Sequence, residues 1–409
     1  MMRASLTGLL ALTVVVACAQ SPSGPPEPIT GLPRALTVAE GEVVQRSNRF
    51  AFALLRRSAA ARDSNVFVSP LSVSMALGMT MNGAANATLD SMRATLGFEG
   101  MPLAEINAGY RGLIDLLRGL DATTDMRVAN SVWFRKGLAA DPDFSAALLA
   151  SFDAKVQALD FGLPSAPSTM NQWVSDATNS RIKEIVGEIP ADIVMYLLNA
   201  IYFKAKWLQQ FDVRDTRPGE FAAGFGGAQT VPTMHRRIDL RVRLGPDVRI
   251  AELRYGNAAF VMDLVMPGPG GDVNALVDSL TPERWASWLA AMNPMSLDVS
   301  LPRFKLEYYR MLNADLAALG MGIAFLDGVA DFRNIFEPNQ TGPFISFVGH
   351  KTFLEVNEEG TEAAAVTSVG MGVTSMPPSF DVDEPFLLVI RERFSGTILF
   401  MGKILRIPQ

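Results

Sequence analysis

Few side chains in this 409-residue chain have the types and spacing that catalytic chemistry needs. Two histidines, His235 and His350, and one cysteine, Cys18, cannot assemble the common zinc sites, and a single cysteine forms no intrachain disulfide. There is no Gly-x-Ser-x-Gly elbow, phosphate loop or His-Glu-x-x-His motif. A Ser/His/Asp hydrolase would have to use one of the histidines, yet His235 has no visible constellation and we expect His350 to be structural. We therefore expect neither catalysis, nor a metal, nor a cofactor.

The overall composition is that of a large globular domain. Apolar residues make up 49% of the chain, the net charge is -6 and the pI is about 5.2. Mild acidity without a basic stripe makes nucleic acid an unlikely partner. We find no internal repeat and no second linker after Pro33, so we expect one domain, a monomer, over residues 37–409.

One stretch, Glu355 to Pro378, contradicts itself locally. Glu358, Glu359 and the alanines after Glu362 favour helix, whereas Gly360 and the Thr/Val/Ser residues that follow do not. Small side chains from Gly360 to Ser375 predict a mobile, exposed and easily cut segment. Small uncharged residues nevertheless alternate with period two, so that one face could be buried in a sheet without a clash. The pattern indicates a loop that can become a strand.

The rest of the chain indicates a mixture of helices and strands. Pro70 suits the first turn of a helix, Ser69 suits its cap, and the following residues to Met81 are apolar nearly all round. The run from Met195 to Phe203 reads as a central strand buried on both faces, with polar Asn199 in need of a partner. We also predict helices at 37–61, 144–152, 314–320 and from Thr281, and strands at 129–134, 155–161, 258–267, 297–304 and 394–404.

Four segments together resemble the serpin family. They are Glu-Glu-Gly-Thr-Glu-Ala-Ala-Ala from Glu358, Asn-Val-Phe-x-Ser-Pro-x-Ser-Val from Asn65, Leu-x-Asn-Ala-x-Tyr-Phe-Lys-x-x-Trp from Leu197, and the ending from Asp383-Glu384-Pro385-Phe386. The resemblance covers roughly Thr37 to Pro408. It implies an α+β fold with a large mixed central β-sheet, two further sheets, about eight or nine helices and an exposed reactive-centre loop at about 358–380.

The resemblance implies a suicide-substrate inhibitor of serine endopeptidases, with cysteine endopeptidases as a second candidate class. The loop would be cut at Thr374–Ser375, with Val373–Thr374 as the near alternative, and would then insert into the central sheet and trap the acyl-enzyme. Thr374 is small, β-branched and uncharged, which fits elastase-like or subtilisin-like target proteases. The alternative is a non-inhibitory serpin that binds a ligand. The hinge that must enter the sheet first would consist of Glu358, Glu359, Gly360, Thr361, Glu362, Ala363, Ala364 and Ala365.

The resemblance also implies a shutter and a breach in the central sheet, where strands part to admit the loop. The residues assigned to these places are Ser69, Ser72, Asn199, Trp207 and His350. It suggests His350 as the partner of Asn199.

The N-terminus reads as an export signal. Arg3 precedes an apolar core to Ala17 that is too short to span a bilayer comfortably, so residues 1–17 are predicted to be a signal peptide. Val15-Val16-Ala17-Cys18 looks like a bacterial lipobox, with lipidation at Cys18; the alternative is ordinary cleavage after the small-residue triplet Ala17-Cys18-Ala19. Residues 18–36 would form a Ser/Pro/Gly-rich tether. We expect an exported protein anchored to the membrane of the cell envelope, the outer membrane in a Gram-negative host, or else extracellular.

Overall fold

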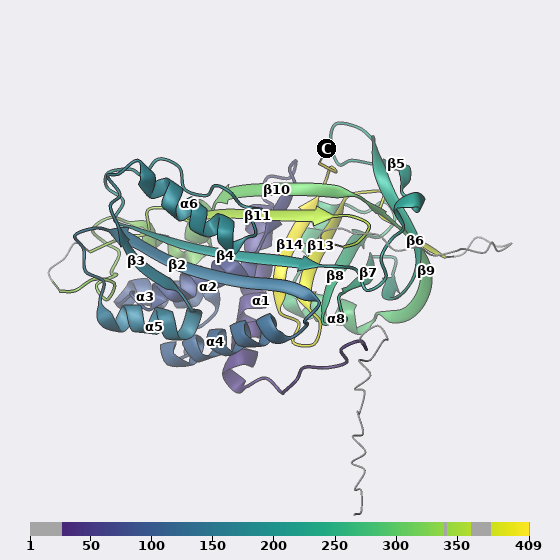
Figure 1. Cartoon of the computed structure of the whole chain (residues 1–409). Helices are drawn as coiled ribbons and strands as arrows, with labels where there is room; N and C mark the ends of the chain where they lie inside the picture. Colours follow the sequence, from purple (N-terminus) through teal and green to yellow (C-terminus); the bar gives the residue numbers. More distant parts are fainter. Residues whose placement is uncertain (1–26, 339–341, 361–377, 409) are drawn as a thin grey trace, which may run out of the picture.

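The computed structural model describes residues 27–338, 342–360 and 378–408 (Figure 1). Several predicted features therefore lie outside the described residues: the signal peptide, Cys18, the hinge from Thr361 to Ala365, and the bond Thr374–Ser375.

Nine α-helices form within these ranges. They are α1 (Val38–Ser58), α2 (Pro70–Met81), α3 (Asn86–Leu96), α4 (Leu103–Gly119), α5 (Pro142–Phe152), α6 (Ser165–Ala177), α7 (Val273–Asp278), α8 (Pro282–Ala290) and α9 (Asn313–Leu316). A capping box starts α1: Thr37 Oγ1 accepts from Glu40 N–H, and the Glu40 carboxylate accepts from Thr37 N–H at 2.7 Å. Short turns occur at η1 (Val213–Asp215), η2 (Ala317–Met321) and η3 (Gly322–Phe325).

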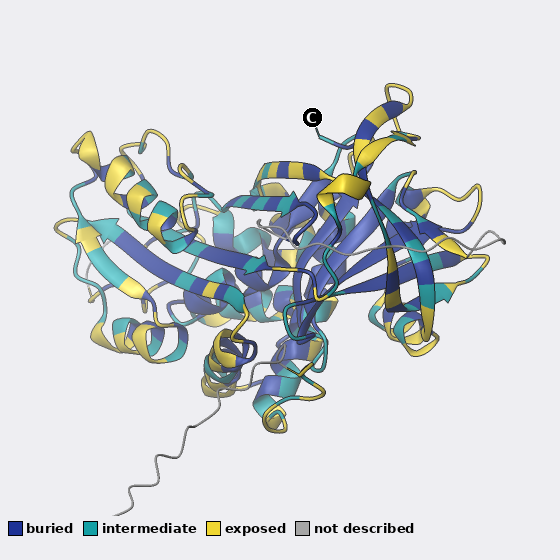
Figure 2. Cartoon of the chain, turned by 45° about the vertical axis from the view of Figure 1, so that its right-hand side comes forward, coloured by how far each residue is buried: buried dark blue, intermediate teal, exposed yellow. Residues whose placement is uncertain are grey.

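The largest sheet has nine strands and mixed direction. Its order is β1-β14-β13-β8-β7-β6-β9-β12, with β5 paired to β6, and β12 runs parallel to β9. Its strands are β1 (Val66–Val68), β5 (Arg217–Phe221), β6 (Gln229–Leu244), β7 (Val248–Tyr255), β8 (Phe260–Pro267), β9 (Asn293–Pro302), β12 (Ser379–Asp381), β13 (Phe386–Glu392) and β14 (Ile398–Ile404). Every residue of β8, β13 and β14 is buried (Figure 2), since helices and other strands cover both faces.

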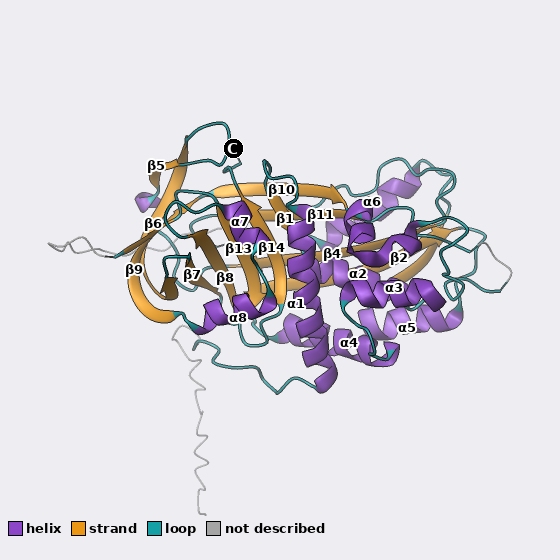
Figure 3. Ribbon diagram, turned by 180° about the vertical axis from the view of Figure 1, so that it is seen from behind, coloured by secondary structure: helices purple, strands orange, loops and turns teal. Residues whose placement is uncertain are grey.

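Two smaller sheets lie beside each other. One has the order β3-β2-β4 and the other is the pair β10-β11. Their strands are β2 (Thr124–Arg135), β3 (Lys155–Leu159), β4 (Met195–Ala205), β10 (Phe304–Met311) and β11 (Gly349–Val356). Helices α2 to α5 lie below the strands of the β3-β2-β4 sheet and α6 lies above them in both Figure 1 and Figure 3. The α+β architecture of one large mixed sheet with two further sheets is confirmed.

Most predicted elements are present, with three informative differences. The predicted strand at 297–304 is two strands, β9 and β10, with Arg303 between them. The strand containing Asn199 is not buried on both faces along its whole length, because Met195, Leu197 and Asn199 are partly exposed. The predicted helix at 314–320 is only α9, which passes into the η2 turn where Gly320 has φ +120°.

The end of the predicted tether is packed on the domain. The N–H of Ile29 donates to the carbonyl oxygen of Asn257 at 2.6 Å, and Ile29, Leu32 and Leu36 pack against the main core. Arg34 forms a two-pronged ion pair with Glu40 on α1. The part of the segment 18–36 that the structure describes, from residue 27, is therefore attached to the domain and does not serve as a free tether.

Candidate functional site at the boundary of two sheets

Two adjacent strands, β4 and β11, form the boundary between the smaller sheets. Both are fully described, yet no ladder of backbone pairs joins them. A cavity of about 20 Å³ lies at this boundary, between Ile201 to Lys204 on one side and Phe353 and Glu355 on the other. Their arrangement side by side is visible in Figure 1. Because strand edges left without a ladder are templates for another strand, this boundary is where a further strand could be accommodated.

The segment after α6 covers this boundary. The guanidinium of Arg181 lies 5.3 Å from the ring centre of Phe353 and forms an ion pair with Glu355 at 3.8 Å. Lys351 Nζ donates to the carbonyl oxygen of Glu184 at 3.0 Å, which adds a second contact to β11. A strand entering between β4 and β11 would have to displace or pass beneath this cover.

The end of β4 holds the base of the predicted loop. Trp207 N–H donates to the Glu359 carbonyl at 2.6 Å, and its indole Nε1 donates to the Asn357 carbonyl at 2.9 Å. The Trp207 ring stacks on Tyr255 at a centroid distance of 4.3 Å. Stacking and two hydrogen bonds fix Trp207, so the backbone of the loop base is held in one place.

Two glutamates of the predicted hinge are buried here. Glu358 and Glu359 are each 5% exposed. Glu358 accepts from Thr216 Oγ1 at 2.7 Å and pairs with Arg303 at 3.3 Å. Glu359 is less well paired: Lys206 Nζ lies at 3.8 Å, and Oε2 has no hydrogen bond within the described residues. The start of the stretch that we expected to be exposed is therefore anchored, because tertiary partners compensate the burial of its carboxylates.

Gly360 forms the last described link before the loop. Asn357 and Gly360 exchange two backbone hydrogen bonds, and the Asn357 side chain accepts from the N–H groups of Glu359 and Gly360. Gly360 has φ +136°, and a Cβ there would lie 2.3 Å from the Ala205 carbonyl oxygen. Only glycine fits this close approach to the end of β4.

A larger groove opens next to these residues. It has a volume of about 560 Å³ and is lined by Arg303, Phe304, Lys305, Glu355 to Glu359 and Pro408, among others. Lys305 pairs with Glu355 at 3.0 Å across the β10–β11 pair. The groove leaves the start of β10 and the end of β11, beside the loop base, open to solvent.

The predicted shutter residues meet beneath the same boundary. Ser72 Oγ donates to Asn199 Oδ1, and Asn199 Nδ2 donates to Asn130 Oδ1. Asn130 in turn donates to the Phe152 carbonyl at 2.7 Å. This chain of hydrogen bonds joins α2 to β4 and β2, so it holds β4 against α2.

His350 belongs to a second set of contacts. Its Nε2 accepts from the backbone N–H of Ser69 at 2.9 Å, and Ser69 Oγ donates to the Leu399 carbonyl at 2.7 Å. On the same strand, Thr352 Oγ1 donates to the Phe67 carbonyl at 2.6 Å. Burial lowers the pKa of His350 to about 4, so the imidazole is neutral at pH 7 and accepts this bond. The histidine is structural, as its contacts indicate.

Two details of the shutter differ from prediction. We expected His350 to be the partner of Asn199, but Asn199 bonds to Ser72 and Asn130 whereas His350 bonds to Ser69. We expected the Ser69 side chain to cap α2, but it bonds across to β14 and caps nothing. Both differences arise because short polar side chains find tertiary partners that local sequence does not specify.

The structure also brings together residues that sequence reasoning missed around His235. His235 Nδ1 lies 3.1 Å from Ser300 Oγ, and Ser300 Oγ donates to Asp381 Oδ1 at 2.6 Å. The order is wrong for a hydrolase, because the carboxylate binds the hydroxyl and does not orient the imidazole. No sequence pattern predicted this contact, because the three residues lie on three strands that are far apart in the chain.

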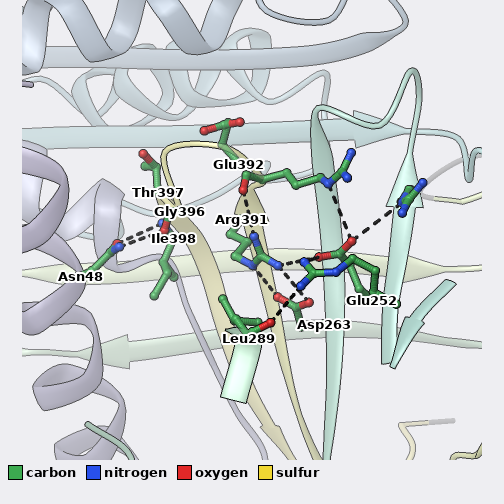
Figure 4. Close-up of polar contacts among 12 residues, drawn as sticks. Asn48, Glu252, Asp263, Leu289, Arg391, Glu392, Gly396, Thr397 and Ile398 are labelled. Atoms are coloured by element: carbon green, nitrogen blue, oxygen red, sulfur yellow. Dashed lines mark hydrogen bonds and ion pairs between the residues drawn. The ribbon is translucent and has the colours of Figure 1, made fainter. Parts of the chain in front are cut away.

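A buried charge cluster in the large sheet was also missed (Figure 4). Arg391 on β13 bonds to Asp263 on β8 at 2.6 Å and to Glu252 on β7 at 2.8 Å, and all three are almost fully buried. Arg241 lies 3.6 Å from Glu252. Burial raises the pKa of Asp263 above its ordinary value, in spite of the adjacent Arg391. Arg391, Glu252 and Asp263 are enclosed within the sheet, which indicates a structural role.

The described parts of the chain contain no group of three or more His, Cys, Asp or Glu side chains arranged to hold a metal ion. In those same ranges, no helix has both the length and the apolar character needed to cross a bilayer.

Comparison with known proteins agrees with this geometry. A family model described as "Serpin (serine protease inhibitor)" matches residues 45–407. Iripin-2 from Ixodes ricinus is 34% identical over 375 residues, which is 89% of this chain and 94% of that protein. A leukocyte elastase inhibitor from Xenopus laevis is 32% identical and covers 83% of this chain and 92% of its own length.

A solved structure matches as well. Human thyroxine-binding globulin, determined as a ligand complex, superposes with a TM-score of 0.84 at 27% identity, over 91% of this chain and all of that one. The family model spans most of the chain and is described as that of serine protease inhibitors, which are not enzymes. The chain belongs to the serpin family.

Proposed function

We propose that this protein is a suicide-substrate inhibitor of serine endopeptidases, with cysteine endopeptidases as a second candidate class. The observation that carries the proposal is the boundary between β4 and β11, which has no ladder and ends at the base of the loop. The first residues that would enter it from Gly360 are Thr361, Ala363 and Ala365, all small and uncharged. Such side chains can be buried in a sheet without leaving a charge unpaired.

The proposed reaction uses the chemistry of the target protease. The nucleophile of the protease attacks the carbonyl carbon of Thr374, the bond to the Ser375 nitrogen breaks, and the amine leaves with a proton. The acyl group of Thr374 remains bonded to the protease. Thr374 lies fourteen residues after Gly360, so insertion lays down about 45 Å of strand at about 3.3 Å per residue. Completion of the sheet supplies the driving force that carries the protease away before hydrolysis.

The choice of target follows from the residue before the cut bond. Threonine offers no cation to a trypsin-like pocket and too little bulk for a chymotrypsin-like one. Proteases with small or shallow apolar pockets, of the elastase or subtilisin kind, fit best. Val373 and Met371 add to this apolar preference. The name of the Xenopus laevis relative, leukocyte elastase inhibitor, supports the same class of target protease.

A second function, binding of a small ligand without inhibition, is favoured by the likeness to thyroxine-binding globulin. A protein that only binds a ligand would not need a hinge without charged or bulky residues. The sequence at Thr361 to Ala365 has the small residues that insertion needs and carries only Glu362 on the opposite face. This distinction favours the inhibitor.

The experiment that separates the two functions is a pair of substitutions at the hinge. Thr361→Arg would bury a cation during insertion and should convert the inhibitor into a substrate that the protease cleaves and releases. Thr361→Ser is the matched control and should inhibit like the unmodified protein. Equal inhibition by both variants would rule out the insertion mechanism, and absence of inhibition by the unmodified protein would favour the ligand-binding function.

We further propose export and lipid anchoring through Cys18, with outer-membrane placement in a Gram-negative host. The lipobox and the export signal support this proposal. A Cys18→Ala variant expressed in its host should move from the membrane fraction to the soluble fraction. Continued membrane association would contradict the anchor and would favour another means of attachment.

A further inference from the structure

The N-terminal segment is attached to the domain beside the base of the loop. The N–H of Ile29 donates to the carbonyl oxygen of Asn257 at 2.6 Å, in the turn between β7 and β8. The neighbouring N–H of Gly256 donates to the carbonyl oxygen of Lys206 at 2.7 Å, and Lys206 forms a backbone bridge with Gly360. Three backbone contacts therefore connect the start of the domain to the loop base.

The attachment does not depend on a single bond. Ile29, Leu32 and Leu36 pack against the main core. Arg34 lies between them in the chain, and its guanidinium holds the buried carboxylate of Glu40 with two hydrogen bonds, at 2.7 and 2.6 Å. The segment is thus fixed from Ile29 to the start of α1, so the place where the chain reaches the domain is also fixed.

The chain between the proposed lipid anchor and this attachment is short. Cys18 and Glu27, the first described residue, are nine positions apart. A fully extended chain spans at most about 3.3–3.6 Å per residue, so nine residues reach no further than about 32 Å. A lipid on Cys18 would therefore hold Glu27 within about 32 Å of the bilayer surface, whatever path these residues take.

The domain is long enough for its two ends to lie at different heights above a membrane. Strand β4 ends at Ala205, beside the loop base, and its eleven residues from Met195 span about 33 Å at about 3.3 Å per residue. Figures 1 and 3 show α5 and α6 at the end where β4 begins, and β6 and β9 at the opposite end. The short tether constrains only the end that carries the loop base.

The exposed arginines near the attachment are paired with carboxylates. Asp121, between α4 and β2, accepts from the N–H of the β7–β8 turn at 2.8 Å, which brings these elements to the attachment. On them, Arg118 pairs with Asp153 at 2.5 Å and Arg127 pairs with Asp125 at 2.7 Å. Paired charges of both signs give little net attraction to anionic lipid. Placement of this end near a bilayer would therefore depend on the anchor and not on the lipid headgroup.

We propose that the anchored protein holds its loop base on the membrane side, and that its partner is a protease working close to the bilayer surface. The proposal rests on the proposed lipid anchor at Cys18. Under the proposed inhibition mechanism, insertion from Gly360 runs along β4 toward Met195. A trapped protease would then be carried from the membrane side of the inhibitor to the side that faces away from the bilayer.

The test is energy transfer from a dye on the protein to an acceptor on the headgroups of neutral phosphatidylcholine vesicles. The lipidated Cys18 is the only natural cysteine, so an introduced cysteine is the only free thiol. Gly31→Cys marks the attachment, where a Cβ meets nothing within 4 Å. Val213→Cys marks the loop base, since Val213 is 54% exposed and lines the groove with Glu358. Ala191→Cys marks the other end, four residues before β4.

We expect transfer to decrease from Gly31→Cys to Val213→Cys and to be lowest for Ala191→Cys. Equal transfer from Val213→Cys and Ala191→Cys, or more from Ala191→Cys, would overturn the proposal. The control is a Gly/Ser spacer of about 36 residues inserted after Gly24, which raises the root-mean-square length of the tether to about 35 Å. The spacer should lower transfer from Gly31→Cys and Val213→Cys. Unchanged transfer would contradict placement by the short tether.

A second preparation separates the geometry from lipidation. A hexahistidine tag joined to Ala19 replaces the anchor, and the three labelled variants are bound to vesicles that contain nickel-chelating lipid. Loss of the expected order on these vesicles would overturn the proposal even if Cys18 is lipidated. The expected order on these vesicles, together with a natural chain that carries no lipid, would contradict the anchor and with it the membrane-side placement in the host.

The consequence for the partner is measured with dye-labelled subtilisin trapped by the anchored protein. We expect transfer from the trapped protease to be lower than transfer from Val213→Cys. High transfer from the trapped protease would contradict its movement away from the bilayer. Absence of any trapped protease would contradict the proposed inhibition, whereas the order of the three dyes would still decide the placement of the domain.

Discussion

Trp207 donates its backbone N–H to the carbonyl oxygen of Glu359 at 2.6 Å, and this bond fixes the base of the loop to the end of β4. The boundary where β4 and β11 lack a ladder begins at this point. The loop base is thus already paired with the strand that an inserting segment would extend along. Under the proposed mechanism, a protein in this state has made the first contact of insertion, and the rest of the ladder is still to form.

At the loop base, Gly360 lies so close to the end of β4 that a side chain would not fit. Gly360→Ala should lower the thermal midpoint of the uncut protein, because a positive φ and a Cβ 2.3 Å from the Ala205 carbonyl oxygen cost about 1–3 kcal/mol. Differential scanning calorimetry measures the change. Gly41→Ala is the control, since that glycine lies in α1 with open space around it and should leave the midpoint level or slightly higher. Equal midpoints for both variants would contradict the close approach.

The shutter makes a prediction about Asn199. Asn199→Ala leaves Ser72 and Asn130 without their partner, so we expect a loss of about 1–3 kcal/mol in the free energy of unfolding of the native form. Urea titration followed by tryptophan fluorescence gives the midpoint. Asn293→Ala removes one bond at an exposed site and should change stability by less than about 0.5 kcal/mol. A neutral Asn199→Ala would show that the hydrogen-bond chain does not hold β4.

The buried imidazole of His350 predicts a loss of stability in acid. The native form binds no proton at His350 until about pH 4, whereas the unfolded chain binds one below about pH 6.5, so stability falls between these values, by about 3 kcal/mol at pH 4. Asp263, whose pKa burial raises in the native form, acts in the opposite direction. His350→Gln keeps an acceptor for Ser69 N–H and should have a smaller loss. Urea midpoints of both proteins are measured at several pH values in this range. An equal dependence of the midpoint on pH in the two proteins would refute the assignment to His350.

The charge cluster predicts a large effect of a single substitution. Arg391→Met leaves Glu252 and Asp263 buried without their main cation, so we expect destabilisation by about 3–5 kcal/mol. Arg62→Met is the matched control, because Arg62 and Asp278 form an exposed pair that contributes about 0–1 kcal/mol. Thermal and urea midpoints of both variants provide the comparison. A loss no larger than that of the control would mean that the cluster is not needed for stability.

Elements with strong local patterns were predictable from the sequence. The sequence correctly predicted a strand at the apolar run around Ala200 and a helix that begins at Pro70. Both could be predicted because the residues that determine them lie within one short segment of the chain. Asn199 was correctly predicted to need a partner. The prediction of its partner was wrong, because the polar groups of Ser72, Asn130 and His350 all lie near the same strands and the sequence does not show which of them Asn199 contacts.

The rest depends on contacts between distant segments. Arg391 lies 128 residues from Asp263 and 139 from Glu252, so no local pattern shows that the three meet. Glu358 and Glu359 have the composition of an exposed turn and are buried only because β4, η1 and the end of β9 surround them. His235 could not be connected to Ser300 and Asp381 before the order of strands β6, β9 and β12 was known.

The central claim is covalent trapping of a protease by the loop, and a denaturing gel tests it most directly. The protein from Gln20 to Gln409 is incubated with neutrophil-type elastase, subtilisin, chymotrypsin and trypsin, and the products are analysed by mass spectrometry. We predict a denaturant-stable complex with elastase or subtilisin and a released C-terminal fragment that begins at Ser375. Cleavage of the loop without a stable complex, for every protease in the set, would contradict the account.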